Sequence, residues 1–161
     1  MTASRRTALL ALPAVCLLLL TGCLLGGGGQ ADPDPSPSPA YDPVPDDQLF
    51  AQVARLDGVR AVDLDYVDTF ANPNSYGGTV TVARDATHVS RIVDRTCAIL
   101  WQGHPDVSVL FEVALPDGSL VSSTSYHLAS PDDLEQRYGP QPGTGEPPQD
   151  APPLPKIPGV P

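Results

Sequence analysis

The spacing of apolar residues after position 45 predicts a helix that begins at Asp46. Leu49, Val53 and Leu56 are three and four positions apart, which places them on one face of a helix. Asp46 is a residue type that caps the first turn, and Gly58 is typical of the position just beyond a helix end.

A second, longer helix is predicted from near Asp85 or Thr87 to about Gln102, with Gly103 as its stop. Its apolar stripe consists of Val89, Ile92, Val93, Thr96, Cys97 and Leu100. Arg91, Asp94 and Arg95 fall outside this stripe, so we expect these three side chains to lie in solvent.

Alternating apolar and polar residues predict strands. In residues 60–68, Leu64 and its apolar neighbours two positions away share one face, and the acids between them share the other. Further strands are predicted at residues 79–84, 107–115 and 119–124. The turn-forming residues 72–78 predict a loop, and 116–118 predict a tight turn. Ser130 before Pro131 predicts a short last helix that ends by Gly139.

This order of elements predicts one α+β domain in residues 46–138. We expect a small antiparallel sheet of about four strands, with two main helices packed on one face. The order is loosely similar to BON-type and other small α+β modules of cell-envelope proteins. The similarity is one of pattern, without a distinctive motif, so it implies no functional residue.

Proline-rich segments flank the predicted domain. Residues 31–45 alternate proline with Asp or Ser, which is typical of an extended spacer, and residues 23–45 are interpreted as a Gly/Pro-rich linker. At about 3.1 Å per residue, residues 24–46 can span roughly 70 Å. Nine prolines in residues 139–161 exclude regular helix and sheet, and we expect a disordered tail.

Residues 1–22 have the three parts of a secretory signal. Arg5 and Arg6 supply positive charge, an apolar run follows from Leu9 to Leu20, and small residues precede Cys23. The apolar run is shorter than the roughly 20 residues that a membrane-spanning helix needs.

The four residues Leu20-Thr21-Gly22-Cys23 resemble the lipobox of the bacterial lipoprotein signal family. The resemblance implies attachment of a diacylglyceryl group to the Cys23 sulfur and cleavage between Gly22 and Cys23. Two or more acyl chains hold a protein stably on a membrane. We therefore expect a lipid-anchored protein on the extracytoplasmic face of the cell membrane.

The charge of the chain changes the set of expected partners. Loss of residues 1–22 would remove two of nine basic residues and leave 19 acidic ones, for a net charge of −12. Such a chain is a poor nucleic-acid binder, because phosphate recognition needs clustered Lys and Arg. Anionic lipid headgroups would also repel it, so the acyl group has to provide the membrane attachment.

The cysteines do not predict a disulfide framework. Cys16 lies in the signal and Cys23 is expected to carry lipid, which leaves Cys97 alone. Cys97 lies on the apolar stripe of the second predicted helix, with no neighbouring cation to activate it, so we interpret it as a core residue.

Two groups of residues raise the question of a metal site. Asp63, Asp65 and Asp68 suggest calcium, but the Gly-bearing turn and the bidentate acid of a calcium loop are missing, and a solvated strand face is the simpler interpretation. His88, His104 and His127 have no Cys or acid at zinc-like spacing, and we expect surface or capping roles. The sequence predicts no metal and no cofactor.

The remaining candidates are hydroxyl and aromatic side chains. Ser122 to Ser125 lack the Gly-x-Ser-x-Gly elbow of a nucleophile, so a polar strand edge is expected. Trp101 and Tyr76 are candidates for an aromatic contact with a partner.

These observations favour a non-catalytic binding or interaction domain, held near the membrane by a flexible tether that raises its effective concentration for an envelope protein. The alternatives are a metal- or solute-binding lipoprotein and an accessory to a cell-wall enzyme. An enzymatic site would have to assemble from Asp63, Asp65, Glu112 and His104.

Overall fold

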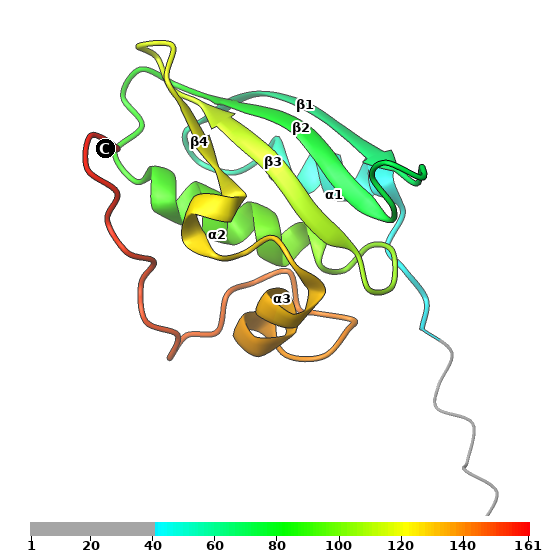
Figure 1. Cartoon of the computed structure of the whole chain (residues 1–161). Helices are drawn as coiled ribbons and strands as arrows, with labels where there is room; N and C mark the ends of the chain where they lie inside the picture. The colour runs from blue at the N-terminus through cyan, green and yellow to red at the C-terminus, as the bar shows by residue number, and fades with distance from the viewer. Residues whose placement is uncertain (1–40) are drawn as a thin grey trace, which may run out of the picture. The chain divides into compact units, whose positions relative to one another are not determined.

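Three α-helices and a four-stranded sheet form in residues 41–161, which are the residues that the computed structural model describes (Figure 1). The elements are α1 (Asp46–Val53), β1 (Val59–Val67), β2 (Ser75–Val82), α2 (Val89–Leu100), β3 (Ser108–Ala114), β4 (Leu120–Ser122), the 3₁₀ helix η1 (Ser123–Tyr126) and α3 (Pro131–Tyr138). The predicted signal, the lipobox and residues 23–40 of the linker lie outside the described residues. In the described part, no helix has the length and apolar character to cross a bilayer.

The sheet has the order β1-β2-β3-β4 and is mixed. β1 and β2 are antiparallel, as are β3 and β4, but β2 and β3 are parallel. The predicted α+β domain with four strands is confirmed, and the expectation of a wholly antiparallel sheet is wrong at its central pair. The physical reason is α2, because a helical crossover between consecutive strands returns the chain to the same end of the sheet.

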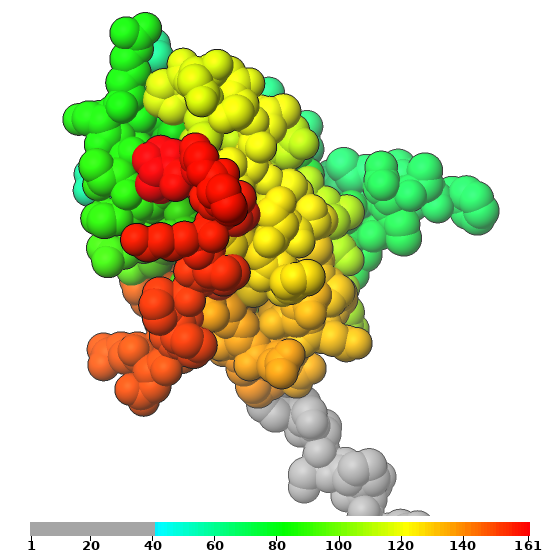
Figure 2. Space-filling model, turned by 60° about the vertical axis from the view of Figure 1, so that its left-hand side comes forward, coloured from blue at the N-terminus to red at the C-terminus, as the bar shows by residue number. Residues whose placement is uncertain are grey.

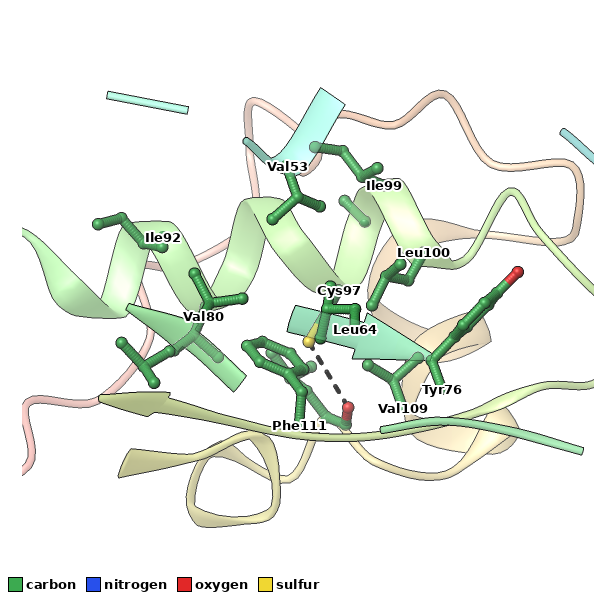
Figure 3. Packing of buried hydrophobic residues seen from close by; sticks show 14 of the residues in the cluster. Val53, Leu64, Tyr76, Val80, Ile92, Cys97, Ile99, Leu100, Val109 and Phe111 are labelled. Atoms are coloured by element: carbon green, nitrogen blue, oxygen red, sulfur yellow. Dashed lines mark hydrogen bonds between the residues drawn. The ribbon is translucent and has the colours of Figure 1, made fainter. Parts of the chain in front are cut away.

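Helix α2 supplies much of the hydrophobic core. Its predicted apolar stripe is buried along its whole length, from Val89 to Leu100. In Figure 3, the side chains of Cys97 and Leu100 lie on the side of α2 that faces Val109 and Phe111 of β3. Complete burial of an aliphatic side chain of this size contributes about 1.5–3 kcal/mol, so the burial of this stripe contributes substantially to the stability of the fold.

The beginning of β2 was not predicted. The strand starts at Ser75 rather than Thr79, so the last four residues of the expected loop belong to the sheet. The first half of β2 contains two glycines, which are uncommon in strands, and the structure explains the second of them. Gly78 has φ +114°, and a Cβ there would lie 2.1 Å from the carbonyl oxygen of Asp63. A glycine is therefore required where β2 passes close to β1.

Other element boundaries also differ from the prediction. Helix α1 ends at Val53 and continues as turns to Gly58, which has φ +83°. Helix α2 begins only at Val89. The fourth strand is short, because the chain enters η1 at Ser123.

The last helix follows its prediction closely. Ser130 is the N-cap and accepts a hydrogen bond from the Asp133 N–H at 3.2 Å, and Pro131 begins the helix. Gly139 follows the last turn with φ +81°. Local sequence signals were sufficient here, because each of them acts within one helical turn.

Asp94 of α2 is buried rather than solvated, which corrects the expectation for this side chain. Its carboxylate accepts two hydrogen bonds from Arg137 of α3, at 2.6 and 2.7 Å, and a third from the Tyr138 hydroxyl at 2.7 Å. A buried carboxylate is tolerated when it is paired and hydrogen-bonded in this way. The cluster joins α3 to α2.

Residues 139–161 contain no helix or strand, as the prolines predicted, but they pack against the domain. The segment runs over the surface in Figure 2, where it is orange to red. Leu154, Ile157 and Val160 contact the hydrophobic core, and the Pro161 carbonyl accepts a hydrogen bond from the Val89 N–H at 3.2 Å. The segment therefore contacts the domain although it forms no helix or strand.

Candidate functional site

A polar and aromatic cluster forms where α1 begins, and we call Asp46, Tyr66, Tyr76 and His104 the Asp46 cluster. The Tyr76 hydroxyl donates a hydrogen bond to the Asp46 carboxylate at 2.5 Å, and His104 Nε2 lies 3.4 Å from the other carboxylate oxygen. About a third of each side chain of the Asp46–His104 pair is exposed. The cluster thus joins α1, the β1–β2 pair and the loop after α2.

The histidine in this cluster is held by aromatic stacking. The His104 ring lies parallel to the Tyr66 ring, with 3.6 Å between centroids and 8° between planes. Tyr66 also meets Tyr76 edge-on at 5.5 Å. Gly103 fits beneath the cluster because it has no side chain, since a Cβ there would lie 2.0 Å from the Tyr76 hydroxyl oxygen.

An Asp–His pair can orient and transfer a proton, but covalent catalysis also needs a nucleophile within hydrogen-bonding reach. Within residues 41–161, the hydroxyl bonded to this pair is that of Tyr76. Burial, together with the hydrogen bond to Asp46, raises the pKa of Tyr76 well above 10, so this hydroxyl stays protonated at neutral pH. The geometry therefore supports a structural connection between elements.

The residues named for a possible enzymatic site do not converge. Asp63 of β1 and Glu112 of β3 stand in one row of the sheet, with Thr79 of β2 between them. They are two strand spacings apart, which is about 10 Å. His104 instead stacks on Tyr66, whose side chain lies on the opposite face of β1 from those of Asp63 and Asp65.

The acidic triplet of β1 has the positions expected of a solvated face. Asp63 and Asp65 are exposed on the strand, and Asp68 follows its end. The Asp68 carboxylate accepts a hydrogen bond from the Asn74 N–H at 3.2 Å. Over the described residues, no group of three or more His, Cys, Asp or Glu side chains is arranged to hold a metal ion.

Tyr76 and Trp101 are buried, which corrects their interpretation as exposed contacts for a partner. Tyr76 has no exposed area and Trp101 retains 2%. The Trp101 indole N–H donates to the Gly139 carbonyl at 2.9 Å, and a Cβ at Gly143 would lie 3.0 Å from its ring. The tail that was expected to be disordered thus helps to cover this ring.

Cys97 is confirmed as a core residue. Its side chain is fully buried, and the thiol lies 3.7 Å from the Leu128 carbonyl oxygen. Burial raises the pKa of the thiol, which keeps it protonated and unreactive at neutral pH. Ser123, the buried member of the serine-rich segment, donates its hydroxyl hydrogen to the Val109 carbonyl at 2.8 Å and so fixes η1 against β3.

An exposed aromatic residue that the sequence analysis did not single out is Phe70. It lies between β1 and β2, and its side chain is fully exposed. Figure 2 shows this connection as a green projection on the right of the molecule. Residues 68–74 are called the hairpin tip below. A lone aromatic residue in a turn-rich segment has no periodicity, so no pattern could have identified it.

The base of the hairpin tip is held by Asn74. Its side-chain amide donates to the carbonyls of Pro105 and Asp106 at 2.7 and 2.9 Å, and its side-chain oxygen accepts from the Tyr66 hydroxyl at 3.1 Å. Asn74 has φ +42°, a left-handed conformation that asparagine tolerates better than most residues. Phe70 is therefore presented from an anchored base.

Comparison of the chain with protein-family models, with curated proteins and with solved structures finds no match.

Proposed function

We propose that the chain is a bacterial lipoprotein anchored through lipid on Cys23, and that its domain binds an envelope protein without catalysing a reaction. The resemblance of residues 20–23 to a lipobox supports the anchor. The observation that supports the binding role is the hairpin tip, which exposes Phe70 from an anchored base.

An exposed phenylalanine on a constrained turn is suited to protein recognition. The free energy of burying its ring in a partner is gained with little loss of backbone entropy, because hydrogen bonds already hold the turn. Within the tip, Asn72 donates its N–H to the Thr69 hydroxyl oxygen at 3.2 Å, and the Asn72 carbonyl accepts from the Thr69 N–H at 3.1 Å. Such preorganisation is typical of the residues that dominate binding energy at interfaces.

The surroundings of Phe70 favour a protein over a lipid surface as its partner. Asp68 lies two residues before it, and the exposed Asp106 lies beside the base of the tip, where its carbonyl accepts from Asn74. Anionic headgroups would repel these carboxylates. An apolar pocket with a basic rim on an envelope protein would accept both the ring and the acids.

The anchor is tested by replacing Cys23→Ala in the native host. The lipoprotein proposal expects the variant to be released from the membrane or to accumulate unprocessed. Retention of the normally processed variant in the membrane fraction would refute the anchor without affecting the proposal for the domain.

The binding role is tested by placing a photoreactive phenylalanine analogue at position 70 of the anchored protein in living cells. The same probe at position 120 is the control, because Leu120 is also exposed but lies on β4 at the other edge of the sheet. We expect one defined adduct from position 70 that is absent from position 120.

The captured protein is then titrated against purified variants. Phe70→Ala should weaken its binding by about 2 kcal/mol, roughly 30-fold, whereas Leu120→Ala should leave it unchanged. Equal affinities of the two variants for the captured protein, or identical adducts from both probe positions, would contradict the assignment of Phe70 as the contact.

A further inference from the structure

A cleft of about 470 Å³ lies between the segment that follows α1 and the segment that leads into α2. Residues 55–58 form one wall, residues 85–88 form another, and the first turns of α2 close the third side. Sites for small molecules commonly have volumes of about 300–1,000 Å³. The cleft is therefore large enough for a ligand of a few carbon atoms and its polar groups.

Basic residues outnumber acidic ones in the lining of this cleft, although the chain as a whole is acidic. Of the seven basic residues after position 22, three line it, namely Arg55, Arg91 and Arg95, and His88 lies beside them. Arg91 and Arg95 are four positions apart on α2, so they project from the same side of the helix. Guanidinium groups from two elements thus face one space, which is an arrangement suited to a multiply charged anion.

Two of these arginines have no acidic partner within the described part of the chain. The ion pairs found there are Arg95 with Glu146, Arg137 with Asp94 and His104 with Asp46. Arg55 and Arg91 take part in none of them, and both are exposed. A ligand can therefore bind these two guanidinium groups without breaking any of these ion pairs.

The direction of α2 adds to the positive potential. His88 is the N-cap residue and provides no side-chain cap, and the helix that follows has twelve residues. The N-terminal end of a helix has a partial positive charge that favours anions, and this charge is present here although the Val89 N–H itself donates to the Pro161 carbonyl. His88 and Arg91 place this end of the helix at the cleft.

The other residues of the cleft restrict the chemistry of the ligand. Leu56, Ala86 and Ile92 contribute apolar surface, and Asp57 and Asp85 contribute carboxylates that form no ion pair with the arginines. Carboxylates accept hydrogen bonds from hydroxyl groups but repel a second phosphate. A ligand with one anionic end and a hydroxyl-bearing carbon chain could contact the arginines with its anionic end and the carboxylates with its hydroxyl groups.

We propose that this cleft binds a small phosphate ester that carries hydroxyl groups, with the phosphate on Arg55 and Arg91 and the hydroxyls toward Asp57 and Asp85. The cleft is separate from the hairpin tip. Gly58 and Asp85 lie where the β1–β2 pair begins and ends along the chain, whereas Phe70 lies in the connection at its far end. The two binding sites can therefore be tested independently.

The proposal is tested by calorimetric titration of the full-length chain in detergent with glycerol 3-phosphate, inorganic phosphate and glycerol. We expect saturable binding of glycerol 3-phosphate to one site, weaker binding of inorganic phosphate and none of glycerol. Vesicles of phosphatidylglycerol present the same groups on a lipid. Because the acyl anchor inserts into any bilayer, these vesicles are compared, without detergent, with vesicles of phosphatidylcholine. Stronger binding to phosphatidylglycerol without binding to the soluble ester would identify a membrane lipid as the source of the phosphate.

Variants locate the site. Arg91→Gln should weaken binding of glycerol 3-phosphate at least about tenfold, because it removes a charge-assisted hydrogen-bond donor. Arg60→Gln removes the same charge from an exposed position on β1 outside the cleft, so it should leave the affinity unchanged.

Absence of binding to every phosphate probe would overturn the proposal. Equal affinity of the Arg91→Gln variant and the unaltered chain would also overturn it. If inorganic phosphate bound as tightly as its glycerol ester, the proposed contacts of the hydroxyl groups would be wrong.

Discussion

Two aspartates of this protein lie in clusters of similar composition but different burial. Asp94 accepts hydrogen bonds from Tyr138 and Arg137, and Asp46 accepts one from Tyr76 and lies beside His104. The Asp94 and Arg137 side chains are 12% and 13% exposed, whereas those of Asp46 and His104 are 34% and 36% exposed.

The basic partner accounts for much of this difference. Arginine keeps its charge throughout the accessible pH range and fits a carboxylate with two parallel hydrogen bonds, and the bond to Asp94 raises the pKa of Arg137 further. Histidine is charged only when protonated, and His104 is 3.4 Å from its carboxylate. The Asp94–Arg137 pair, in which both charges are permanent, is therefore stable in the interior. The Asp46–His104 pair lies where water can solvate the carboxylate whether or not the histidine is charged.

Removal of the permanent cation should produce the largest loss of stability. The Arg137→Met variant leaves Asp94 buried with the Tyr138 hydroxyl as its remaining side-chain donor. An uncompensated buried charge costs about 3–5 kcal/mol, so we expect the free energy of unfolding in urea to fall by that amount. Arg60→Met, at an exposed position, is the matched control. A loss below about 1 kcal/mol for Arg137→Met would mean that Asp94 is not confined as the structure indicates.

The packing of the Asp46 cluster is tested at Gly103. In the Gly103→Ala variant the new methyl group would lie 2.0 Å from the Tyr76 hydroxyl oxygen and 2.9 Å from a Leu49 methyl carbon. Overpacking of this kind costs about 1–3 kcal/mol, which thermal and urea unfolding would detect.

Gly77→Ala is the control for this substitution, because the nearest atom to a Cβ there is 3.9 Å away. Equal stability of the two variants would show that the residues of the Asp46 cluster move readily to accommodate a methyl group. The two clusters would then differ in rigidity as well as in burial.

The two clusters also show which features a sequence can predict. The apolar stripe of α2 and the capping of α3 were predicted correctly, because their signals repeat within a few residues. Asp94 lies beside that stripe and resembles any solvated acid in the sequence. Its partner Arg137 is 43 positions away, so only the folded chain reveals the pairing.

Features without periodicity were missed for related reasons. Gly77 and Gly78 have no side chains to alternate, so the beginning of β2 resembled a loop. The prolines of residues 139–161 correctly excluded helix and strand, but an extended segment can still pack through scattered apolar residues such as Leu154 and Ile157. The exposure of Phe70 and of the arginines in the cleft depends on which distant segments cover them in the folded chain, and no local pattern encodes this.

Alkaline pH provides a graded test of both clusters. Burial raises the pKa of Tyr76 and of Tyr138 above the ordinary value of 10.0. Above pH 10 the unfolded chain loses these protons while the folded chain keeps them, so stability is intact below pH 10 and declines as the pH rises. Each tyrosine contributes at most about 1.4 kcal/mol per pH unit to the decline.

Unfolding free energies measured between pH 9 and 11 should therefore fall less steeply in Tyr138→Phe and in Tyr76→Phe than in the unaltered chain. Any stability that the phenylalanine variants lose at pH 8 through the missing hydroxyl does not depend on pH. An unchanged slope in Tyr138→Phe would show that this hydroxyl ionises as readily in the folded protein as in the unfolded one.

The smallest effect is expected for the half-exposed ion pair itself. In the His104→Asn variant Asp46 keeps its hydrogen bond from Tyr76 and its access to water, and the stacking partner of Tyr66 is replaced by a planar amide. Exposed ion pairs contribute about 0–1 kcal/mol, so the free energy of unfolding should fall by less than about 1 kcal/mol. The measurement is urea unfolding at pH 5 and pH 8, in low and high salt. A loss as large as that of Arg137→Met would mean that His104 is as essential to its cluster as Arg137 is to the other, and burial would no longer explain the difference between the two aspartates.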